Sequence, residues 1–304
     1  MKSVMGWAAF GLFASLSVQA ANVTIEHQMG KTTLEQNPQR VVVIGIGPLD
    51  AVHYFGINPV AVSKVAELPD YLAQYRGAEY APAGSLFEPD FERIYMQKPD
   101  VIITGPRAAR TAYDELSKIA PTVVFAVDDS QPYWESTQAQ WRNLGKLFSI
   151  EDKVEAKIAE LDNTFTQVHD YNQKHQAQAM TVMSSGGNIT TFGANSRFAA
   201  IYKDFGFREA ATVKQTANHG NLISYEYIRQ NNPQTLFIID RDRLVNKGES
   251  RTREEFENTL IKATDAYQQH RMVFLDLNAW YLAIAGVTAT EQMLSDMQVN
   301  LHQE

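Results

Sequence analysis

The chain has 304 residues, of which 44% are hydrophobic and 20% charged, and this length and balance predict a folded protein of about two domains rather than a disordered one. Lysine and arginine number 27 against 35 aspartate and glutamate residues, so the formal net charge of -8 argues against a general binder of nucleic acid or of anionic membranes. The chain has no cysteine, which excludes disulfides, cysteine-ligated zinc, iron–sulfur clusters and thiol nucleophiles.

Residues 1–20 have the order of a secretory signal peptide. Lys2 precedes an apolar run from Val4 to Leu16, and small or polar residues then end at Ala20. This run is shorter than the ~20 residues that a membrane span requires. We therefore expect cleavage after Ala20 and an exported mature chain with no membrane-inserted segment. The lack of a cysteine after the apolar run argues against a lipoprotein anchor.

Short runs of β-branched residues recur along the rest of the chain and are bounded by Gly, Pro or Asp, as buried parallel strands are. Helical spacing of apolar residues lies between them, at 91–96, 114–119 and 253–261 for example. Strands that alternate with helices predict an α/β fold with mainly parallel sheets. The predicted strands are Val41–Ile44, Val60–Val62, Val101–Ile103, Val123–Val127, Met180–Met183, Leu236–Ile239 and Val273–Leu275.

One long helix is predicted between two strand-rich halves. The stretch from Ile150 to Lys174 contains no Gly or Pro, and its apolar residues recur at intervals of three or four. This pattern favours a stiff helix over a flexible linker. We expect an N-terminal α/β lobe at 21–148, the inter-lobe helix at 149–176 and a C-terminal α/β lobe at 177–304.

The two halves share a short sequence pattern. Glu92 lies in an aromatic-Glu-x-Ile segment that precedes Pro99 and a strand, and Glu226 lies in the same pattern before Pro233 and a strand. If the pattern is a repeat, the two glutamates occupy equivalent places on two similar lobes. The alternative is that any helix–proline–strand unit has this form, and the spacing alone does not decide between the two.

Motifs typical of enzymes are absent or incomplete. The turn at 45–48 begins like a dinucleotide-binding fingerprint, but Asp50 takes the place of its third glycine. No G-x-S-x-G, phosphate-binding loop or H-E-x-x-H motif occurs, and the histidines are scattered singly, which disfavours a cage of several histidine ligands. Of these histidines, His219 has a distinctive context, because its loop directly precedes the predicted helix that carries Glu226.

Arginines follow predicted strands at the sheet edge where open α/β folds bind their ligands. Arg107 and Arg110 come after the third predicted strand, Arg241 comes after the sixth, and Arg197 follows a Gly-rich turn. Surface solvation explains each of them singly. Together, in an acidic protein, they predict a pocket for an anion.

Trp280 and Tyr281 follow the last predicted strand. They fit a packing role, in which the phenol is hydrogen-bonded. A tyrosinate oxygen is also a hard donor suited to a hard trivalent cation, so the segment is a candidate for ligand contact.

Several of these segments resemble the periplasmic substrate-binding proteins of ABC importers for siderophores and cobalamin. The resemblance rests on Arg40–Val43, on 88–102 and on the stiff mid-chain helix, and it covers essentially the whole mature chain. Within that family, the segments that resemble binders of catecholate siderophores are Ser196-Arg197-Phe198, Asn218-His219-Gly220, Asp240-Arg241 and Trp280-Tyr281-Leu282.

The resemblance implies a class III periplasmic binding protein, with two Rossmann-like lobes, one long rigid helix joining them and a cleft between them. It implies a monomer free in the periplasm that catalyses no reaction. Such a protein captures a ferric catecholate siderophore of the enterobactin or vibriobactin kind and delivers it to an ABC transporter permease. The resemblance implies no intrinsic cofactor, because Fe(III) enters as part of the siderophore complex, and no nucleic-acid partner.

The same resemblance implies roles for the arginines. Arg197 and Arg241 would contact catecholate oxygens. Pro106 departs from the family's turn after the strand, so Arg107 is our choice for the third contact and Arg110 is the reserve. Guanidinium groups stay protonated and donate forked hydrogen bonds, which suits an anionic ferric complex.

Direct metal contact and permease docking are also implied by the resemblance. His219 and Tyr281 would bind Fe(III) when the siderophore leaves coordination positions open. One acidic residue on each lobe would dock against arginines of the permease, which indicates Glu92 and Glu226, with Glu88 as the nearby alternative.

Two alternatives stay open. Haem or cobalamin is the nearest rival ligand within the family, although neither has the dense negative charge that would call for three cleft arginines. An exported α/β hydrolase is the rival of another class, but the nucleophile–base arrangement that it requires is not found in the sequence.

Overall fold

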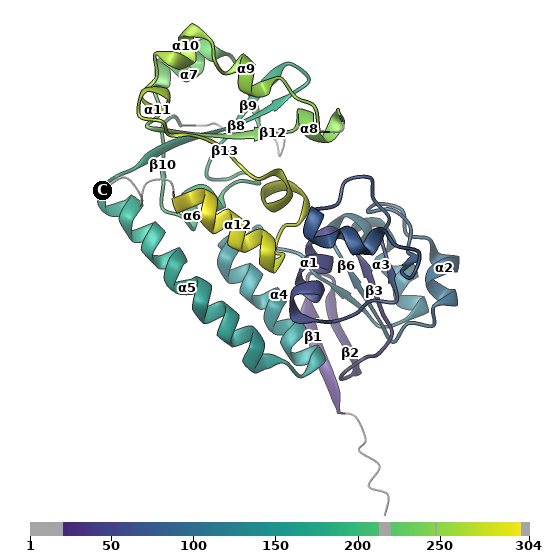
Figure 1. Ribbon diagram of the computed structural model, residues 1–304. Helices are drawn as coiled ribbons and strands as arrows, with labels where there is room; N and C mark the ends of the chain where they lie inside the picture. Colours follow the sequence, from purple (N-terminus) through teal and green to yellow (C-terminus); the bar gives the residue numbers. More distant parts are fainter. Residues whose placement is uncertain (1–20, 213–219, 247, 299–304) are drawn as a thin grey trace, which may run out of the picture.

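The computed structural model describes residues 21–212, 220–246 and 248–298. Two β-sheets surrounded by helices form two lobes, and one long helix, α5, runs beside both (Figure 1). The predicted α/β fold with mainly parallel sheets is confirmed. The expected leader at 1–20 and the candidate ligand His219 lie outside the described residues.

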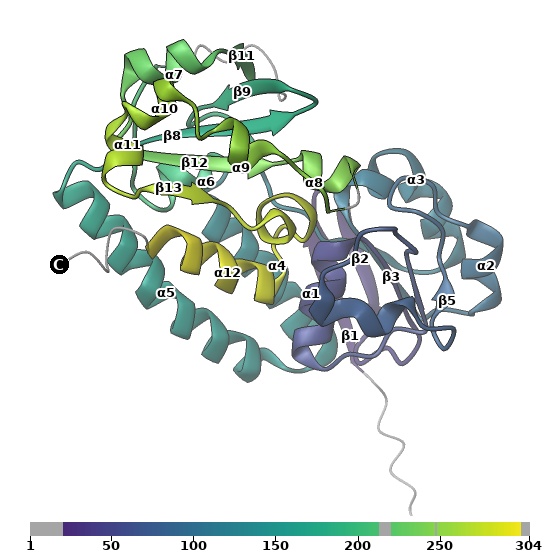
Figure 2. The ribbon, with the colours of Figure 1, turned by 45° about the horizontal axis from the view of Figure 1, so that its top comes forward.

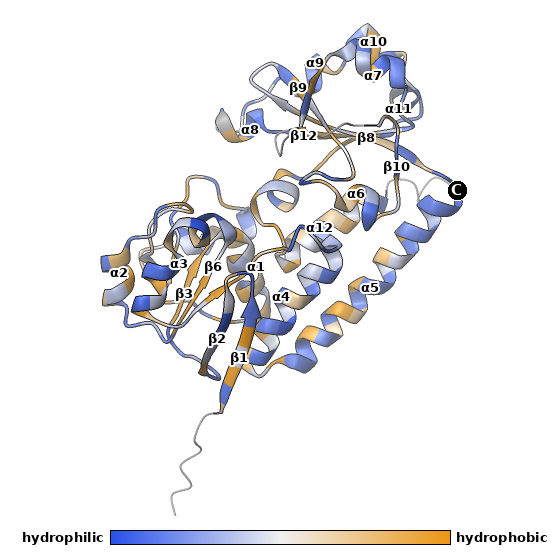
Figure 3. Ribbon diagram, turned by 180° about the vertical axis from the view of Figure 1, so that it is seen from behind, coloured by the Kyte–Doolittle hydropathy of each residue, from blue (hydrophilic) through white to orange (hydrophobic). Residues whose placement is uncertain are grey.

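The sheet of the first lobe is parallel throughout. Its strands are buried because helices cover both faces, so Val42 and Ile102 have no exposed surface and hydrophobic residues gather on β3 and β6 (Figure 3). The strand order is β5 (Ala81–Pro82), β4 (Ala61–Val62), β3 (Val41–Ile44), β6 (Val101–Thr104) and β7 (Thr122–Val124). The helical elements of this lobe include α1 (Ile46–Phe55), the 3₁₀ helix η1 (Asp70–Arg76), α2 (Phe91–Met96) and α3 (Pro106–Ile119).

An antiparallel hairpin that the sequence analysis missed precedes this sheet. It consists of β1 (Asn22–His27) and β2 (Gly30–Glu35). Only Ile25 and Leu34 of the hairpin are buried, so it carries almost no apolar signal. The Thr32 hydroxyl donates to the backbone oxygen of Thr122 over 2.7 Å, which ties the hairpin to β7.

The predicted long helix is confirmed as α5 (Glu151–Lys174), which follows α4 (Tyr133–Phe148). Ser149 separates the two helices in a left-handed conformation, with φ of 53°. The apolar stripe that predicted α5 is its buried face, made of Val154, Ile158, Leu161, Phe165 and Val168. Because this face packs along its whole length, α5 is a stiff connection between the lobes.

The sheet of the second lobe is mixed. Its order is β11 (Asn221–Ile223), β9 (Asn188–Phe192), β8 (Gln178–Ser185), β12 (Thr235–Asp240) and β13 (Met272–Phe274), with β10 (Arg208–Glu209) also paired to β8. The pairings of β8, β10, β12 and β13 are parallel, whereas β9 and β11 are antiparallel. Gly186 and Gly187, both at positive φ, form the tight turn that reverses the chain between β8 and β9.

Short helices cover the second sheet. The helix predicted over 253–261 is wrong: the structure has α9 (Thr252–Glu255) and α10 (Thr259–Lys262) instead. The Asn258 side chain accepts hydrogen bonds from the backbone of Leu260 and Ile261, so it ends one helix and starts the next. The other short helices are α6 (Ala200–Lys203), α7 (Tyr225–Asn231), α8 (Asp242–Val245) and α11 (Asp265–Gln268).

The chain after β13 returns to the first lobe. It forms one π-helical turn, η2 (Asn278–Leu282), and then α12 (Val287–Met297), which lies between α1 and α5 in both views (Figures 1 and 2). Lys157 of α5 pairs with Glu291 of α12. Within the described ranges, no helix combines the length and the apolar character needed to cross a bilayer.

Candidate ligand-binding site

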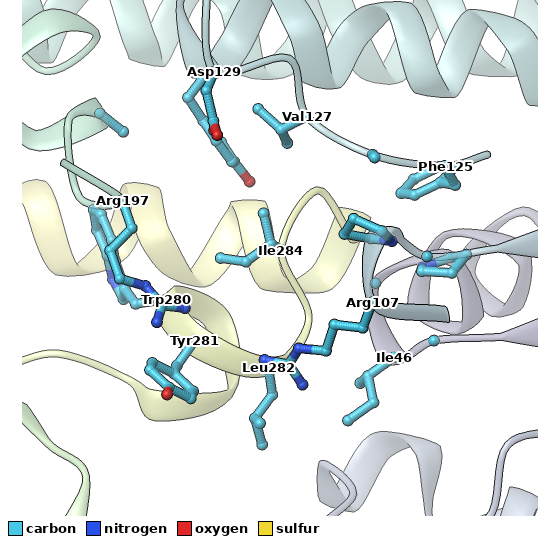
Figure 4. Close-up of a pocket in the computed structure, with 18 of the residues that line it drawn as sticks. Ile46, Arg107, Phe125, Val127, Asp129, Arg197, Trp280, Tyr281, Leu282 and Ile284 are labelled. Atoms are coloured by element: carbon cyan, nitrogen blue, oxygen red, sulfur yellow. The ribbon is translucent and has the colours of Figure 1, made fainter. Parts of the chain in front are cut away.

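A cavity of about 600 Å³ lies between the two lobes. The turns that follow β3, β6 and β7 form its wall on the first lobe, and the segment 195–204 faces them from the second. The η2 turn closes the space between these two walls (Figure 4). The cavity therefore occupies the place beyond the carboxyl ends of parallel strands where α/β proteins bind their ligands.

The first lobe contributes one half-buried guanidinium to the cavity. Arg107 stands in the first turn of α3, directly after the turn that follows β6, and its side chain extends toward η2 (Figure 4). Its Cζ lies 5.4 Å from the ring centroid of Phe87. Burial lowers the pKa of Arg107, and the charge of Arg197 acts in the same direction while Tyr281 opposes it. An arginine in this state gains from any anion placed between it and the opposite wall.

Arg110 lies one helical turn further along α3. It also lines the cavity, but its side chain is exposed. Arg107 is therefore the more buried of the two.

The second lobe contributes two arginines that meet at one phenol. The Arg197 guanidinium lies over the Tyr281 ring, with 4.1 Å between its Cζ and the ring centroid. Arg241 donates to Ser185 Oγ over 2.9 Å, and its charge acts on the Tyr281 phenol and lowers its pKa. Arg241 is not one of the residues that line the cavity, so it reaches the site through Tyr281.

The electrostatics of Tyr281 follow from this packing. Burial by itself raises the pKa of the phenol, but the charges of Arg197 and Arg241 and their hydrogen bonds outweigh it and hold the pKa below the ordinary value of 10. Positive charge stabilises the phenolate. Tyr281 is thereby prepared to act as an anionic oxygen donor.

Trp280 serves the same segment in another way. Its side chain is 2% exposed, and its indole nitrogen donates to Asp296 Oδ2 over 2.8 Å. Asp296 accepts from the backbone of Asp276 as well, over 2.9 Å. Trp280 lines the cavity, and its hydrogen bond to Asp296 ties η2 to α12. The neighbouring Tyr281 is thereby held in a fixed orientation.

Of the two candidate metal ligands, Tyr281 lies within the described residues. His219 lies outside the described residues, and Gly220, which follows it, begins the segment that leads into β11. Within the residues that the structure describes, no group of three or more His, Asp or Glu side chains is arranged to hold a metal ion.

The two glutamates of the repeated pattern occupy matching positions. Glu92 stands in the first turn of α2, capped by Asp90, and Glu226 stands in the first turn of α7, capped by Ser224. Both side chains are exposed. Helix α2 leads into β6, which lies between β3 and β7, while α7 leads into β12, which lies between β8 and β13. Glu88, the nearby alternative, is also exposed.

Three polar residues that were not predicted from the sequence also line the cavity. Asp129 and Gln131 line it from the segment after β7, and Lys203 lines it from α6. In Figure 4, Asp129 lies across the cavity from Arg107. The rule that drew attention to arginines after strands applies equally to β7 and would have found the first two.

The sequence and the fold are similar to those of proteins of known family. Residues 41–279 match the periplasmic binding protein family. The chain belongs to that family. The crystal structure of the periplasmic catecholate-siderophore binding protein VctP from Vibrio cholerae is 62% identical and superimposes with a TM-score of 0.89, covering 92% of this chain and 100% of that one.

More distant members of the periplasmic binding protein family are similar over most of their length. The petrobactin-binding protein YclQ of Bacillus subtilis is 34% identical, covering 92% of this chain and 88% of its own. The ferric-anguibactin-binding protein FatB of Vibrio anguillarum is 29% identical, covering 90% of this chain and 86% of its own. These relatives are substrate-binding proteins, and the two lobes joined by α5 are the class III architecture that the resemblance implied.

Proposed function

We propose that this protein captures ferric catecholate siderophores in the inter-lobe cavity and delivers them to an ABC permease for iron uptake. The observation that carries the proposal is that Arg107 lines the cavity from the first lobe and Arg197 and Tyr281 line it from the other side, while the charge of Arg241 acts on Tyr281. The similarity to a catecholate-siderophore binding protein over the whole described chain supports the same ligand class.

The charge of the site suits this ligand. A ferric complex of catecholates carries net negative charge, because each catecholate contributes two anionic oxygens. Guanidinium groups on both walls offset that charge and can donate paired hydrogen bonds to the oxygens. The partial burial of Arg107 strengthens the interaction, since less water screens it.

Direct contact between protein and iron extends the proposal. A siderophore with fewer catecholate groups leaves coordination positions open, and the Tyr281 phenolate is a donor suited to Fe(III). We assign His219 as the second protein donor. The protein has no cofactor of its own in this account, because the iron belongs to the transported complex.

Docking to the permease is assigned to Glu92 and Glu226, with Glu88 as the alternative beside α2. Acidic side chains at the exposed ends of both lobes would pair with basic residues of a transporter that contacts both lobes at once. Most of the large exposed apolar side chains of the described residues lie near the first of these positions, namely Phe87, Phe91, Tyr95 and Met96, whereas Leu222 lies near the second.

The remaining assignments belong to the same proposal. We infer a leader at 1–20 that is cleaved on export, a periplasmic monomer, and lobes at 21–148 and 177–304 joined by 149–176. The position of α12 beside α1 adds that the end of the second segment contacts the first lobe.

A ligand panel tests the proposal. Ferric catecholates, haem and cobalamin are titrated against the purified mature protein while its tryptophan fluorescence is followed. Ferric catecholates should quench the fluorescence at the lowest concentrations. Tight binding of haem or cobalamin without binding of ferric catecholates would contradict the proposal and favour the rival ligand.

A further inference from the structure

A buried carboxylate connects the first lobe to the segment that carries Tyr281. Asp50, on α1, has no exposed surface. Its Oδ1 accepts from the backbone of Thr288 and its Oδ2 from that of Ala289, both over 3.0 Å. The hydroxyl of Tyr71 donates to Oδ2 over 2.7 Å. A carboxylate is seldom buried without a specific partner, and here the partner is the first turn of α12.

Helix α12 needs this carboxylate because it has no cap of its own. The first backbone N–H groups of a helix have no partner within it, and the residue before α12 is Gly286, which lacks a side chain to accept them. Asp50 supplies the acceptor from another lobe, and its charge also suits the positive end of the helix. A methyl group on Gly286 would overlap the Asp50 carboxyl, so the close approach depends on glycine.

Neighbouring contacts fasten the same stretch to the first lobe. A methyl group on Gly47 of α1 would overlap the backbone oxygen of Ile284, so these two backbones are in close contact. The indole nitrogen of Trp141 donates to the backbone oxygen of Ala285 over 2.7 Å. The segment 284–289 is therefore held by α1 and α4, and it directly follows η2.

We propose that Asp50 is a positioning residue of the ligand site, which fixes Tyr281 against Arg197 and Arg241 by capping α12 from the first lobe. Tyr281 lies on the segment that follows the last strand of the second sheet. The residues after it, Thr288 and Ala289, are held by Asp50 of the first lobe. Loss of the cap would release 284–289 and let the phenol move away from the two guanidinium groups. The proposal rests on the proposed function only in assigning Tyr281 to the ligand.

The first test needs no siderophore. Tyrosine is labelled with ¹³C at Cζ, and the Tyr281 NMR signal is assigned by its absence in Tyr281→Phe. At one fixed pH, Asp50→Ala should change the chemical shift of this signal, because the phenol ring then leaves its position beneath the Arg197 guanidinium. The matched control is Asn258→Ala, which also removes a side chain that caps a helix over two backbone N–H groups but lies away from the cavity, and it should leave the signal unchanged. An unchanged Tyr281 chemical shift in folded Asp50→Ala would overturn the proposal.

Asp50→Asn covers the case in which Asp50→Ala does not fold. The amide keeps one oxygen acceptor for α12 and turns a donor toward the other N–H group, so the chemical shift of the Tyr281 signal should change in the same direction by a smaller amount. An Asp50→Asn protein with the wild-type Tyr281 chemical shift would count against the proposal equally.

Ligand affinity gives a second readout. Asp50→Ala should weaken binding of a ferric bis-catecholate about tenfold, and the loss should largely disappear in a Tyr281→Phe background because the two residues act through one contact. An equal loss in both backgrounds would show a general structural role and overturn the proposal. If Tyr281→Phe itself leaves the bis-catecholate affinity unchanged, the metal role in the proposed function has failed, while the NMR chemical shift of Tyr281 still decides the role of Asp50.

Discussion

The two lobes have similar functional features, but these features differ in detail. Each places arginine after a central strand and a glutamate on a short capped helix. The first lobe offers one arginine, Arg107, whose pKa is lowered by burial. The second offers Arg197 and Arg241, which hold the pKa of Tyr281 low. The difference teaches that the arginines of the second lobe already interact with the Tyr281 phenol in the ligand-free protein. The positive charge of Arg107 on the first lobe, in contrast, is balanced mainly when an anionic ligand binds.

The helices that carry the two proposed docking glutamates, α2 and α7, are unequal in another respect. Ile94 of α2 and Ile228 of α7 are both fully buried, and each helix has its own side-chain cap, so the two helices are built alike. Exposed aromatic and methionine side chains surround α2, whereas Leu222, 70% exposed, is the comparable residue beside α7 in the described chain. The surface around α2 thus exposes more apolar side chains for contact with a partner than the surface around α7 does.

The largest expected effect tests whether both ends dock. Charge reversal in Glu92→Lys with Glu226→Lys should abolish siderophore-dependent iron uptake, because both acidic contacts then repel a basic permease surface. Uptake of labelled ferric siderophore is measured in cells that express only the variant. Binding to the purified variant should stay intact, and Glu35→Lys, an exposed charge reversal on β2, is the control. Wild-type uptake by the double variant would remove both glutamates from the docking account.

The second prediction tests the inequality of the cavity walls. Arg197→Gln with Arg241→Gln should weaken ferric tris-catecholate binding about a thousandfold, whereas Arg107→Gln should weaken it about tenfold, because a hydrogen bond to a charged group contributes roughly 1.5–3 kcal/mol. Fluorescence titration measures both. Arg243→Gln, an exposed neighbour on α8, is the control. If Arg107→Gln had the larger effect, the order of the two walls would be reversed.

The third prediction concerns the connection of α12 to the first lobe. Burial raises the pKa of Asp50 from 3.8 to about 6, although the hydrogen bonds from Tyr71 and α12 act against it. The folded protein then holds this proton more tightly than the unfolded chain, so the ionised carboxylate is destabilising above its folded pKa. The unfolding free energy of the wild type relative to Asp50→Asn should fall by about 2 kcal/mol between pH 4 and pH 7. Urea unfolding at both pH values measures it, and a difference that does not change with pH would refute the environment described for Asp50.

The smallest expected effect separates the metal contact from the charge contact. Tyr281→Phe with His219→Ala should weaken a ferric bis-catecholate about tenfold more than a complete tris-catecholate, because only the former has open iron positions. Competition binding with both complexes on the same variant gives the ratio. Equal losses would leave Tyr281 as a packing partner of Arg197 rather than an iron ligand.

Much of the fold could be predicted from sequence because its central strands are buried on both faces. Val41–Ile44 and Leu236–Ile239 are uninterrupted apolar runs, and the stripe from Val154 to Val168 has helical spacing. The hairpin at 22–35 was missed because a strand with one lightly buried face lacks this signal. The helix expected over 253–261 failed because the local capping by Asn258 competes with the apolar spacing.

A residue that lines the cavity could be predicted from the sequence where it lies soon after the end of a strand. Arg107 follows its strand directly and lines the cavity, as does Asp129, to which the same rule was not applied. Contacts between distant segments leave no local pattern. Asp50 and Thr288 are 238 positions apart. Only the folded chain shows that Asp50, which stands where the dinucleotide-binding fingerprint would have its third glycine, caps α12.

A crystal structure of the complex with a ferric tris-catecholate tests the central claim most directly. We predict the iron complex in the inter-lobe cavity, with catecholate oxygens on Arg197 and Arg241 at the second wall and on Arg107 at the first. A complex bound outside this cavity, or bound within it without arginine contacts from both lobes, would contradict the account.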